Sequence, residues 1–357
     1  MATELLLGLD PRSAAVAAGA SLGLAFGILA QRTRFCLRRG IAGKLAERGP
    51  ALGTWAMALA VAVAGTAAIQ AAGLVDLSGH RLLSARLPLV AIVVGGLLFG
   101  VGMVLARGCA SRLTVLAGSG NLRALTVLIV FAAVAHATLK GALAPVRTSL
   151  GAFGLDLGGQ TSLAALPGGM LLWTAFIVLA LVPIVYRSGA TVAGLAGGAA
   201  IGALAPLGWL ATGWLLKDDF DPVPVESIAL TSAGAETLFW WIASSAIQPT
   251  FGVGFLGGVL GGSLLAAVVA GEWKLEGFND ETPTGRYLVG GVLMGVGGVL
   301  AGGCTIGAGL AGVGTLSIAA LLAFGSILAG GVLATRLAAV RLMSPAHVAA
   351  GAGAISL

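Results

Sequence analysis

Three cysteines are the side chains of this sequence with the most distinctive chemistry. Cys36, Cys109 and Cys304 lie far apart, in the contexts RTRFCLRRG, ARGCASR and GGCTIGAG. Their odd number and the lack of a CxxC motif disfavour a disulfide framework. No histidine lies at ligand spacing from a cysteine, which disfavours a metal site. Because an isolated cysteine is usually a small buried apolar residue, a functional role requires a second observation.

An internal repeat supplies that observation for two of the cysteines. Residues 94–109, VGGLLFGVGMVLARGC, match residues 289–304, VGGVLMGVGGVLAGGC, at twelve of sixteen positions with a constant offset of 195. A fainter match between spaced glycines extends the duplication to a first repeat at 13–150 and a second at 169–340, and it leaves Cys36 without a counterpart. We expect pseudo-symmetric repeats in inverted orientation, as in many secondary transporters.

Short segments interrupt the apolar pattern at both repeated cysteines. Residues 110–121 and 305–314 are too short and too rich in glycine to cross a membrane, and prolines interrupt two further segments at 206–216 and 225–232. These features predict broken or re-entrant helices. Non-helical backbone at membrane depth must be buried in protein or line a polar cavity. The chain breaks therefore indicate a path through the protein.

The composition predicts that these segments lie in a lipid bilayer. Hydrophobic residues make up 58% of the 357 residues and charged residues only 10%, whereas about a quarter of an ordinary soluble domain is charged. The sequence predicts an all-α polytopic membrane protein, a single membrane domain over 1–357, with about nine transmembrane helices of roughly 20 residues each and several short re-entrant helices. The apolar runs are 13–30, 51–72, 87–106, 124–143, 169–186, 190–205, 252–271, 286–301 and 315–335.

The distribution of charge predicts an orientation. Segment 31–49 holds six basic residues against Glu47 alone, and the positive-inside rule assigns such a segment to the cytoplasm. We expect the acidic clusters at 218–221 and 272–281 to face outward. The net charge of +6 then reflects membrane topology, with no nucleic-acid partner.

The two repeated cysteines lie in sequences that suit an anion. Gly108 and Gly303 precede the cysteines and allow close approach, while Ser111 and Thr305 place a hydroxyl near each thiol. A half-helix that begins at this point would direct free N–H groups and the positive end of its dipole at a ligand. A polarizable thiol suits a soft sulfur atom, and such weak contacts allow release.

Several charged residues flank these motifs. Arg34, Arg107 and Arg112 either draw an anion inward, since intramembrane charges usually face cavities, or extend to lipid headgroups; the sequence leaves both readings open. We expect Glu226, which follows Pro224, to cap a helix, whereas Glu236 could cap a helix or relay protons.

These motifs together resemble those of the YeeE/YedE family of sulfur-transport membrane proteins. The resemblance implies an hourglass of spanning helices with short helices entering from both sides, and it implies that Cys36, Cys109 and Cys304 line a thiosulfate path. Thr33 and Ala308 depart from the family pattern, which has serine and a polar residue at those positions in many members. The matching segments are QRTRFC at 31–36, ARGCASR at 106–112, SGNLRAL at 119–125, PVESIALTSAGAETLFW at 224–240, EGFND at 276–280 and LMGVGGVLAGGCTIGAGL at 293–310.

The sequence and the resemblance predict a thiosulfate uptake transporter in the inner (plasma) membrane of a prokaryote. It would pass the anion along the three cysteines by non-covalent contacts, without a cofactor or enzymatic activity. Some relatives carry a sulfur-carrier-like domain, so a separate cytosolic protein of the TusA-like type is a candidate partner. Two alternatives stay open: a permease for another sulfur or selenium species, and a membrane sulfurtransferase that forms a cysteine persulfide. The lack of CxxC and of a redox-cofactor motif disfavours the sulfurtransferase.

Overall fold

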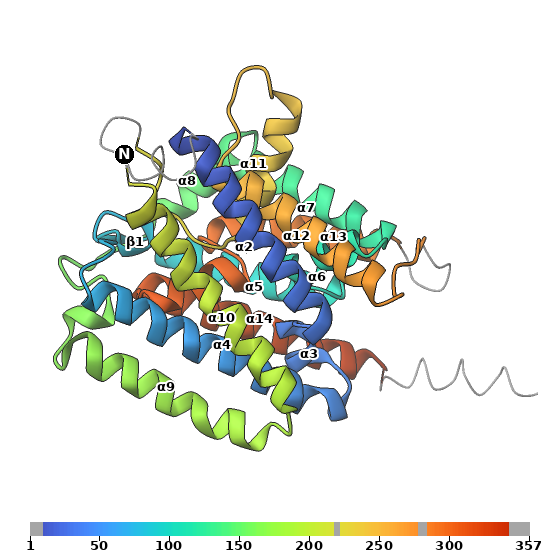
Figure 1. The fold of residues 1–357 in the computed structure, drawn as a ribbon, viewed down its shortest axis with the longest axis horizontal. Coiled ribbons are helices and arrows are strands. Elements are labelled where there is room, and N and C mark those ends of the chain that lie inside the picture. The colour runs from blue at the N-terminus through green and yellow to red at the C-terminus, as the bar shows by residue number, and fades with distance from the viewer. Residues whose placement is uncertain (1–9, 218–221, 278–283, 343–357) are drawn as a thin grey trace, which may run out of the picture.

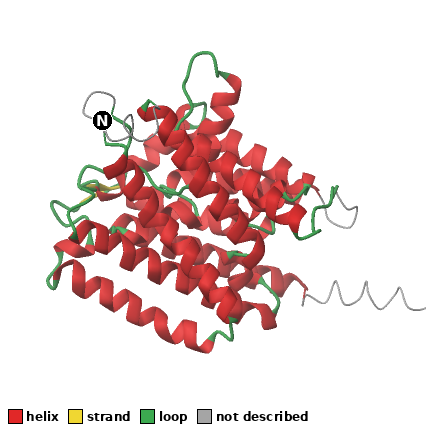
Figure 2. Cartoon of the chain, in the orientation of Figure 1, coloured by secondary structure: helices red, strands yellow, loops and turns green. Residues whose placement is uncertain are grey.

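The computed structural model describes residues 10–217, 222–277 and 284–342, and this part of the chain is built almost entirely of helices (Figures 1 and 2). Within these residues, nine helical segments are long and apolar enough to cross a membrane. The prediction of a polytopic α-helical membrane protein is therefore confirmed. The segments are Pro11–Ala42, Leu45–Ala71, Leu89–Gly118, Leu122–Lys140, Gly169–Arg187, Val192–Leu215, Phe251–Val269, Thr284–Gly312 and Ile318–Ala338.

Short elements lie between and at the ends of the long helices. The long helices are α2 (Pro11–Thr33), α4 (Leu45–Ala71), α5 (Leu89–Leu105), α7 (Leu122–Lys140), α9 (Gly169–Arg187), α10 (Val192–Leu210), α12 (Phe251–Val269), α13 (Thr284–Leu300) and α14 (Ile318–Leu342). The shorter ones are α3 (Leu37–Ala42), α6 (Ala110–Gly118), α8 (Ala144–Ala152), α11 (Leu230–Ile242), the 3-10 turns η1 (Arg81–Leu83) and η2 (Leu163–Ala165), and the π-helical segments η3 (Ala211–Leu215) and η4 (Thr305–Gly312).

One predicted chain break is wrong. Pro206 lies inside α10, and the helix continues to Leu210 and on into η3, so 206–216 is the end of a spanning helix. The ring of Pro206 packs against Gly65 of α4. A Cβ added to Gly65 would come within 2.8 Å of the proline ring. The interruption comes later, in the non-helical residues 222–229 that lead into α11.

Glycines let the long helices approach each other closely. A Cβ on Gly23 of α2 would overlap the carbonyl oxygen of Phe255 in α12, and one on Gly258 would overlap that of Ala20. Gly202 of α10 faces the carbonyl oxygen of Ala58 in α4 in the same way. Small residues give this contact in membranes, where packing rather than the hydrophobic effect holds helices together.

The helices pair in a regular pattern. Helix α2 packs on α12 and α10 packs on α4, while α5 and α13 pack on each other. In addition, α5 contacts α14, and α13 contacts α7. Helix α9 packs against α4 at the periphery, along the lower edge of Figure 1, and buries none of its residues.

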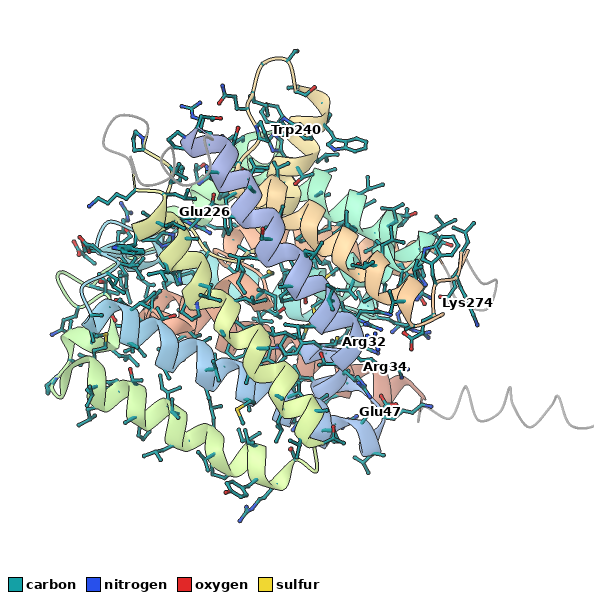
Figure 3. The ribbon with its side chains drawn as sticks, viewed as in Figure 1. Arg32, Arg34, Glu47, Glu226, Trp240 and Lys274 are labelled. Carbon is teal, nitrogen blue, oxygen red and sulfur yellow. The ribbon has the colours of Figure 1, made fainter. Side chains whose placement is uncertain are left out.

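The connecting segments gather at two ends of the helix bundle. Arg32, Arg34, Glu47 and Lys274 lie toward one end, which we call the basic end, and Glu226 lies toward the other, the opposite end (Figure 3). At the opposite end the two-residue strands β1 (Arg86–Leu87) and β2 (Leu155–Asp156) pair antiparallel and join the segments before α5 and after α8.

The expected position of one acidic cluster is wrong. Gln31 donates a hydrogen bond to Glu272 at 3.2 Å, so residues 272–277 lie at the basic end beside segment 31–49. Acidic residues contribute little to membrane orientation, which is why their sequence position misleads. Asp218, Asp219 and Asp221 of the other cluster, and residues 278–281 of this one, lie outside the described residues.

Candidate functional site

Each cysteine follows a helix that ends in a left-handed residue. Arg34 (φ 51°), Arg107 (φ 56°) and Gly302 (φ 77°) each stand two positions before a cysteine. Helix α5 closes with Gly108 N–H donating to the Met103 carbonyl at 3.0 Å, the six-residue bond of a Schellman motif. The left-handed residue changes the direction of the chain, so that each cysteine lies between the end of one helix and the start of the next.

The cysteines occupy the residue just before each short helix. Cys36 precedes α3, Cys109 precedes α6 and Cys304 precedes η4, all in extended backbone conformation. The Cys304 sulfur accepts the Gly307 N–H at 3.5 Å, and the Cys109 sulfur lies 3.1 Å from the Ser111 hydroxyl. A helix start leaves N–H groups without intrahelical partners, and here thiols lie beside those groups.

Two of the thiols come together in the interior. All three cysteines are free, and Cys36, Cys109 and Cys304 are 6%, 1% and 0% exposed. The thiols of Cys36 and Cys109 lie within hydrogen-bonding reach of each other, and the Thr305 hydroxyl approaches Cys109 from η4. That hydroxyl is fully buried without a standard hydrogen bond. The chain breaks of both repeats thus contribute to one polar interior region, here called the thiol region: Cys36, Cys109, Cys304 and Thr305.

A half-buried arginine with one fully buried guanidinium nitrogen borders the thiol region. Arg112 lies within Coulombic range of Cys36 and Cys109, and its Nη1 atom is buried with no hydrogen-bond partner among the described residues. A buried charge without a partner costs several kcal/mol. Arg112 is therefore suited to an anion that enters the thiol region and leaves it.

The other two candidate arginines differ in their surroundings. Arg34 is exposed and lines a pocket of about 170 Å³ at the basic end, together with Cys36 and Arg39. Arg107 instead lies over the ring of Tyr287, 6.0 Å from its centroid. Arg34 can therefore meet an anion in the smaller pocket, whereas Arg107 stabilises the start of α13 through the tyrosine.

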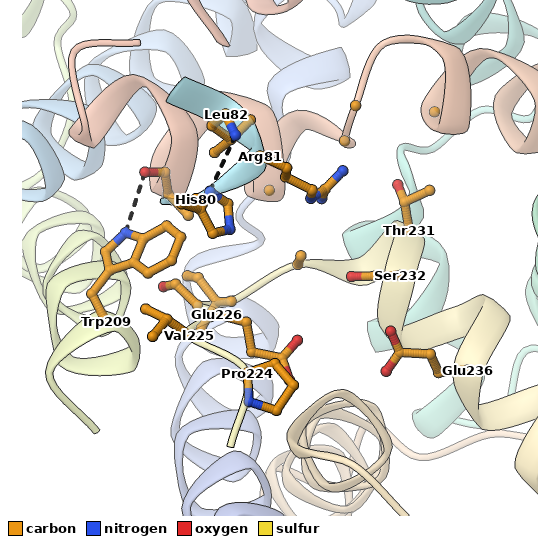
Figure 4. A pocket seen from close by; sticks show the side chains of 18 of the residues that line it. His80, Arg81, Leu82, Trp209, Pro224, Val225, Glu226, Thr231, Ser232 and Glu236 are labelled. Carbon is orange, nitrogen blue, oxygen red and sulfur yellow. Dashed lines mark hydrogen bonds between the residues drawn. The ribbon is translucent and has the colours of Figure 1, made fainter. Parts of the chain in front are cut away.

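A larger pocket of about 640 Å³ opens at the opposite end (Figure 4). Gly302, Gly303 and Gly307, which surround Cys304, form part of its wall, and His80, Arg81 and Glu226 line it from other elements. The thiol region therefore lies between two pockets. The larger one reaches the turn of Cys304 and the smaller one reaches Cys36.

The expectation that Glu226 caps a helix is wrong. Helix α11 begins after Ala229, and that residue makes no side-chain cap. Thr212 holds the backbone of Glu226 from both sides, accepting its N–H at 3.0 Å and donating to its carbonyl at 2.6 Å. The carboxyl group of Glu226 points into the larger pocket together with that of Glu236 (Figure 4).

The larger pocket shifts the pKa values of the ionisable groups that line it. Burial raises the pKa of Glu226 to about 8, with the nearby Glu236 adding to the rise and Arg81 opposing it. Burial also lowers the pKa of His80 to about 4, with Arg81 contributing, and its Nδ1 accepts the Leu82 N–H at 3.2 Å. Near neutral pH the histidine is thus neutral and Glu226 is mostly protonated.

Fold and site together define a multi-span membrane transport protein, with two pockets on either side of a buried region of thiols. Residues 32–333 match the sulphur-transport family, and the chain belongs to this family. It is 29% identical over 300 residues to the thiosulfate transporter TsuA of Spirochaeta thermophila, covering 79% of this chain and 87% of that protein. It is 26% identical over 312 residues to TsuA of Escherichia coli, covering 80% and 84%.

Proposed function

We propose that this protein takes up thiosulfate across the inner membrane of a prokaryote, with its basic end in the cytoplasm as the positive-inside rule requires. The observation that carries the proposal is Arg112, which lies beside the Cys36–Cys109 pair and whose buried Nη1 atom has no hydrogen-bond partner among the described residues. The names of the two relatives support thiosulfate as the substrate.

The transport steps follow from the order of the groups. The anion occupies the larger pocket first and then reaches the Gly303–Cys304 turn, where backbone N–H groups start η4. It next meets Cys109 and Cys36 beside Arg112, and it leaves through the smaller pocket past Arg34. Thiols donate weak hydrogen bonds to the terminal sulfur atom, and several weak sites in series allow passage without trapping.

The proposal includes two pseudo-symmetric, inverted repeats, at 13–150 and 169–340. Their exchange would relate α2 to α10, α4 to α12, α5 to α13, and α7 to α14. The contacts support this, because α2 packs on α12 as α10 packs on α4, and α5 contacts α14 as α13 contacts α7. A substrate path at the interface of such repeats is common in secondary transporters.

The cytoplasmic partner is a further part of the proposal. A separate sulfur-carrier protein of the TusA-like type would receive the anion at the basic end, where Arg34 and Arg39 line the smaller pocket. A sulfurtransferase is the weaker alternative, because Cys109 and Cys304 are at most 1% exposed and only Cys36, which lines the smaller pocket, could pass a persulfide to a carrier protein. The burial of the cysteines does not distinguish a thiosulfate permease from a permease for another sulfur or selenium anion.

Uptake by reconstituted protein tests the proposal. Purified protein in liposomes should accumulate labelled thiosulfate, with sulfate and selenite as competitors that define the substrate. Cys109→Ala and Cys304→Ala should each abolish uptake while the protein stays folded in detergent. Thr114→Ala is the matched control, because Thr114 is equally buried on α6 but bonds only the Ala110 carbonyl of its own helix, at 2.9 Å. Normal uptake by both cysteine variants would refute the path.

A further inference from the structure

Two carboxyl groups line the larger pocket, where burial makes their ionised forms costly. Glu226 is fixed through its backbone by Thr212, so its side chain is free to face the pocket. Glu236 accepts one hydrogen bond, from the Thr250 hydroxyl at 2.7 Å, through Oε2. Placing two carboxylates in one partly buried space is unfavourable because like charges repel. A transporter for a dianion would gain nothing from two fixed negative charges in its outer pocket.

The charges that face Glu226 come from several elements. Asp76 and His80 precede or begin the η1 turn, Arg81 lies on it, Glu236 lies on α11, and Lys140 at the end of α7 acts on Glu236. His80 is neutral in this setting. Lys217 acts on Asp76. With both glutamates ionised, three carboxylates balance three cations, and the pocket has no net positive charge to attract a dianion. Protonation of one glutamate leaves a positive excess.

An unused hydrogen-bond donor points into the same space. Thr231, at the start of α11, lines the larger pocket and is 5% exposed, yet its hydroxyl has no hydrogen-bond partner among the described residues. Burial of a hydroxyl without a hydrogen bond is unfavourable. Thr231 lies against α13, where a Cβ added to Gly298 would be 3.1 Å from the hydroxyl oxygen, and it lines the same pocket as Gly302 and Gly303 before Cys304.

We propose that the larger pocket binds the sulfonate end of the substrate together with a proton held on Glu226. The neutral carboxylic acid donates its O–H to one anion oxygen, Thr231 donates a second hydrogen bond, and Arg81 supplies the positive charge. The terminal sulfur then points at Cys304. Ionised Glu226 accepts hydrogen bonds and donates none, so it repels the anion. This inference rests on the proposed function, and it adds that the outer pH controls substrate binding.

The pKa of about 8 for Glu226 sets the expected range. Below it the carboxyl group is protonated and the pocket accepts the anion; above it the group is ionised and binding is lost. The control is external, because the larger pocket opens at the opposite end, away from the cytoplasm. A sodium site would be an alternative use of two carboxylates, and it would respond to sodium concentration at constant pH.

The experiment measures initial uptake of labelled thiosulfate into proteoliposomes at constant internal pH and clamped membrane potential, while the external pH is raised from about 6 to about 9.5 across the range of a shifted carboxyl. Wild-type uptake should fall about tenfold for each pH unit above the transition. Glu226→Gln, with its rate normalised to its own value at acid pH, should lose this fall because the amide keeps a donor and never ionises.

Two further variants keep the test decisive. Glu236→Gln should move the fall in uptake to lower pH, since it removes the neighbouring charge that raises the pKa of Glu226. Asp156→Asn, an exposed carboxylate at the same end, should keep the wild-type profile. A flat wild-type profile, a Glu226→Gln profile that falls like wild type, or a dependence on sodium at fixed pH would overturn the inference. Absence of wild-type uptake at every pH would instead refute the proposed function.

Discussion

The two ends of the thiol region use the same backbone device with different side chains. Cys36 precedes α3 with φ −166° and ψ 116°, and Ala229 precedes α11 with φ −152° and ψ 135°. Cys36 faces Cys109, whereas Ala229 lies beside the Cys304 turn, where a Cβ added to Gly307 would come 3.0 Å from its own. One end therefore has two thiols in contact and the other has a single thiol next to a methyl group.

The two ends also differ in the charged side chains around the thiols. Arg34, Arg39 and Arg112 gather around the paired thiols, while Glu226 and Glu236 gather in the pocket beside the single thiol. The same backbone arrangement can thus hold basic side chains at one end and carboxyl groups at the other. In the proposed path, the anion would meet the carboxyl groups first and the arginines last.

The pairing of Cys36 with Cys109 gives the prediction with the largest effect. A small membrane-permeant oxidant such as diamide should join these two sulfurs in wild-type protein and leave Cys304 reduced, because the Cys36 and Cys109 thiols lie within hydrogen-bonding reach of each other and a disulfide needs two cysteines that are already close. Uptake should stop and return on reduction. Mass spectrometry after differential alkylation identifies the linked peptides.

The Cys36→Ser variant provides the control for this reaction, since it should keep all remaining thiols reduced. A Cys109–Cys304 disulfide as the main product would show that Cys109 is paired with Cys304 and not with Cys36, and would contradict the comparison of the two ends.

Arg112 gives the next largest effect. Arg112→Gln should raise KM for thiosulfate about tenfold to a hundredfold, as expected for a lost hydrogen bond to a charged group of about 1.5–3 kcal/mol. The protein without substrate should not melt at a lower temperature, because the variant removes a charged group whose buried Nη1 atom has no hydrogen-bond partner among the described residues. Kinetics in liposomes and thermal unfolding in detergent are the two measurements.

Arg32→Gln is the matched control, because Arg32 is an exposed arginine in the last turn of α2, and the KM of this variant should not change. A lower melting temperature for Arg112→Gln with an unchanged KM would show that Arg112 has a structural role and does not attract the anion.

The sequence could predict those parts of the fold that depend on local pattern. Nine apolar runs gave the spans, and the repeated GC motifs at 109 and 304 gave the chain breaks, because a bilayer tolerates such interruptions only inside protein. The left-handed residues were harder to predict. Gly302 carries the usual glycine signal, but Arg34 and Arg107 adopt the same conformation against their own preference, since the helices around them fix the turn.

The larger pocket could not be predicted from sequence because its wall comes from distant segments. Arg81 follows α4, Glu226 follows α10, and Gly303 follows α13. Glu226 gave a local signal, a carboxylate after proline, that suggested a helix cap. Its actual environment depends on Thr212, fourteen residues earlier, and on the packing that brings these segments together.

The glycines before the repeated cysteines give the smallest expected effect and compare the two ends most directly. A Cβ at Gly108 would meet only the flexible Leu113 side chain, at 3.2 Å, whereas one at Gly303 would lie 2.7 Å from the Ala308 backbone nitrogen. Gly303→Ala should therefore destabilise the protein by about 1–3 kcal/mol, the usual cost of overpacking, and Gly108→Ala should cost little because a leucine side chain can move. Thermal unfolding in detergent measures both. Equal losses would show that the two chain breaks are packed alike, and would leave the thiol pair and the carboxyl groups as the differences between the ends.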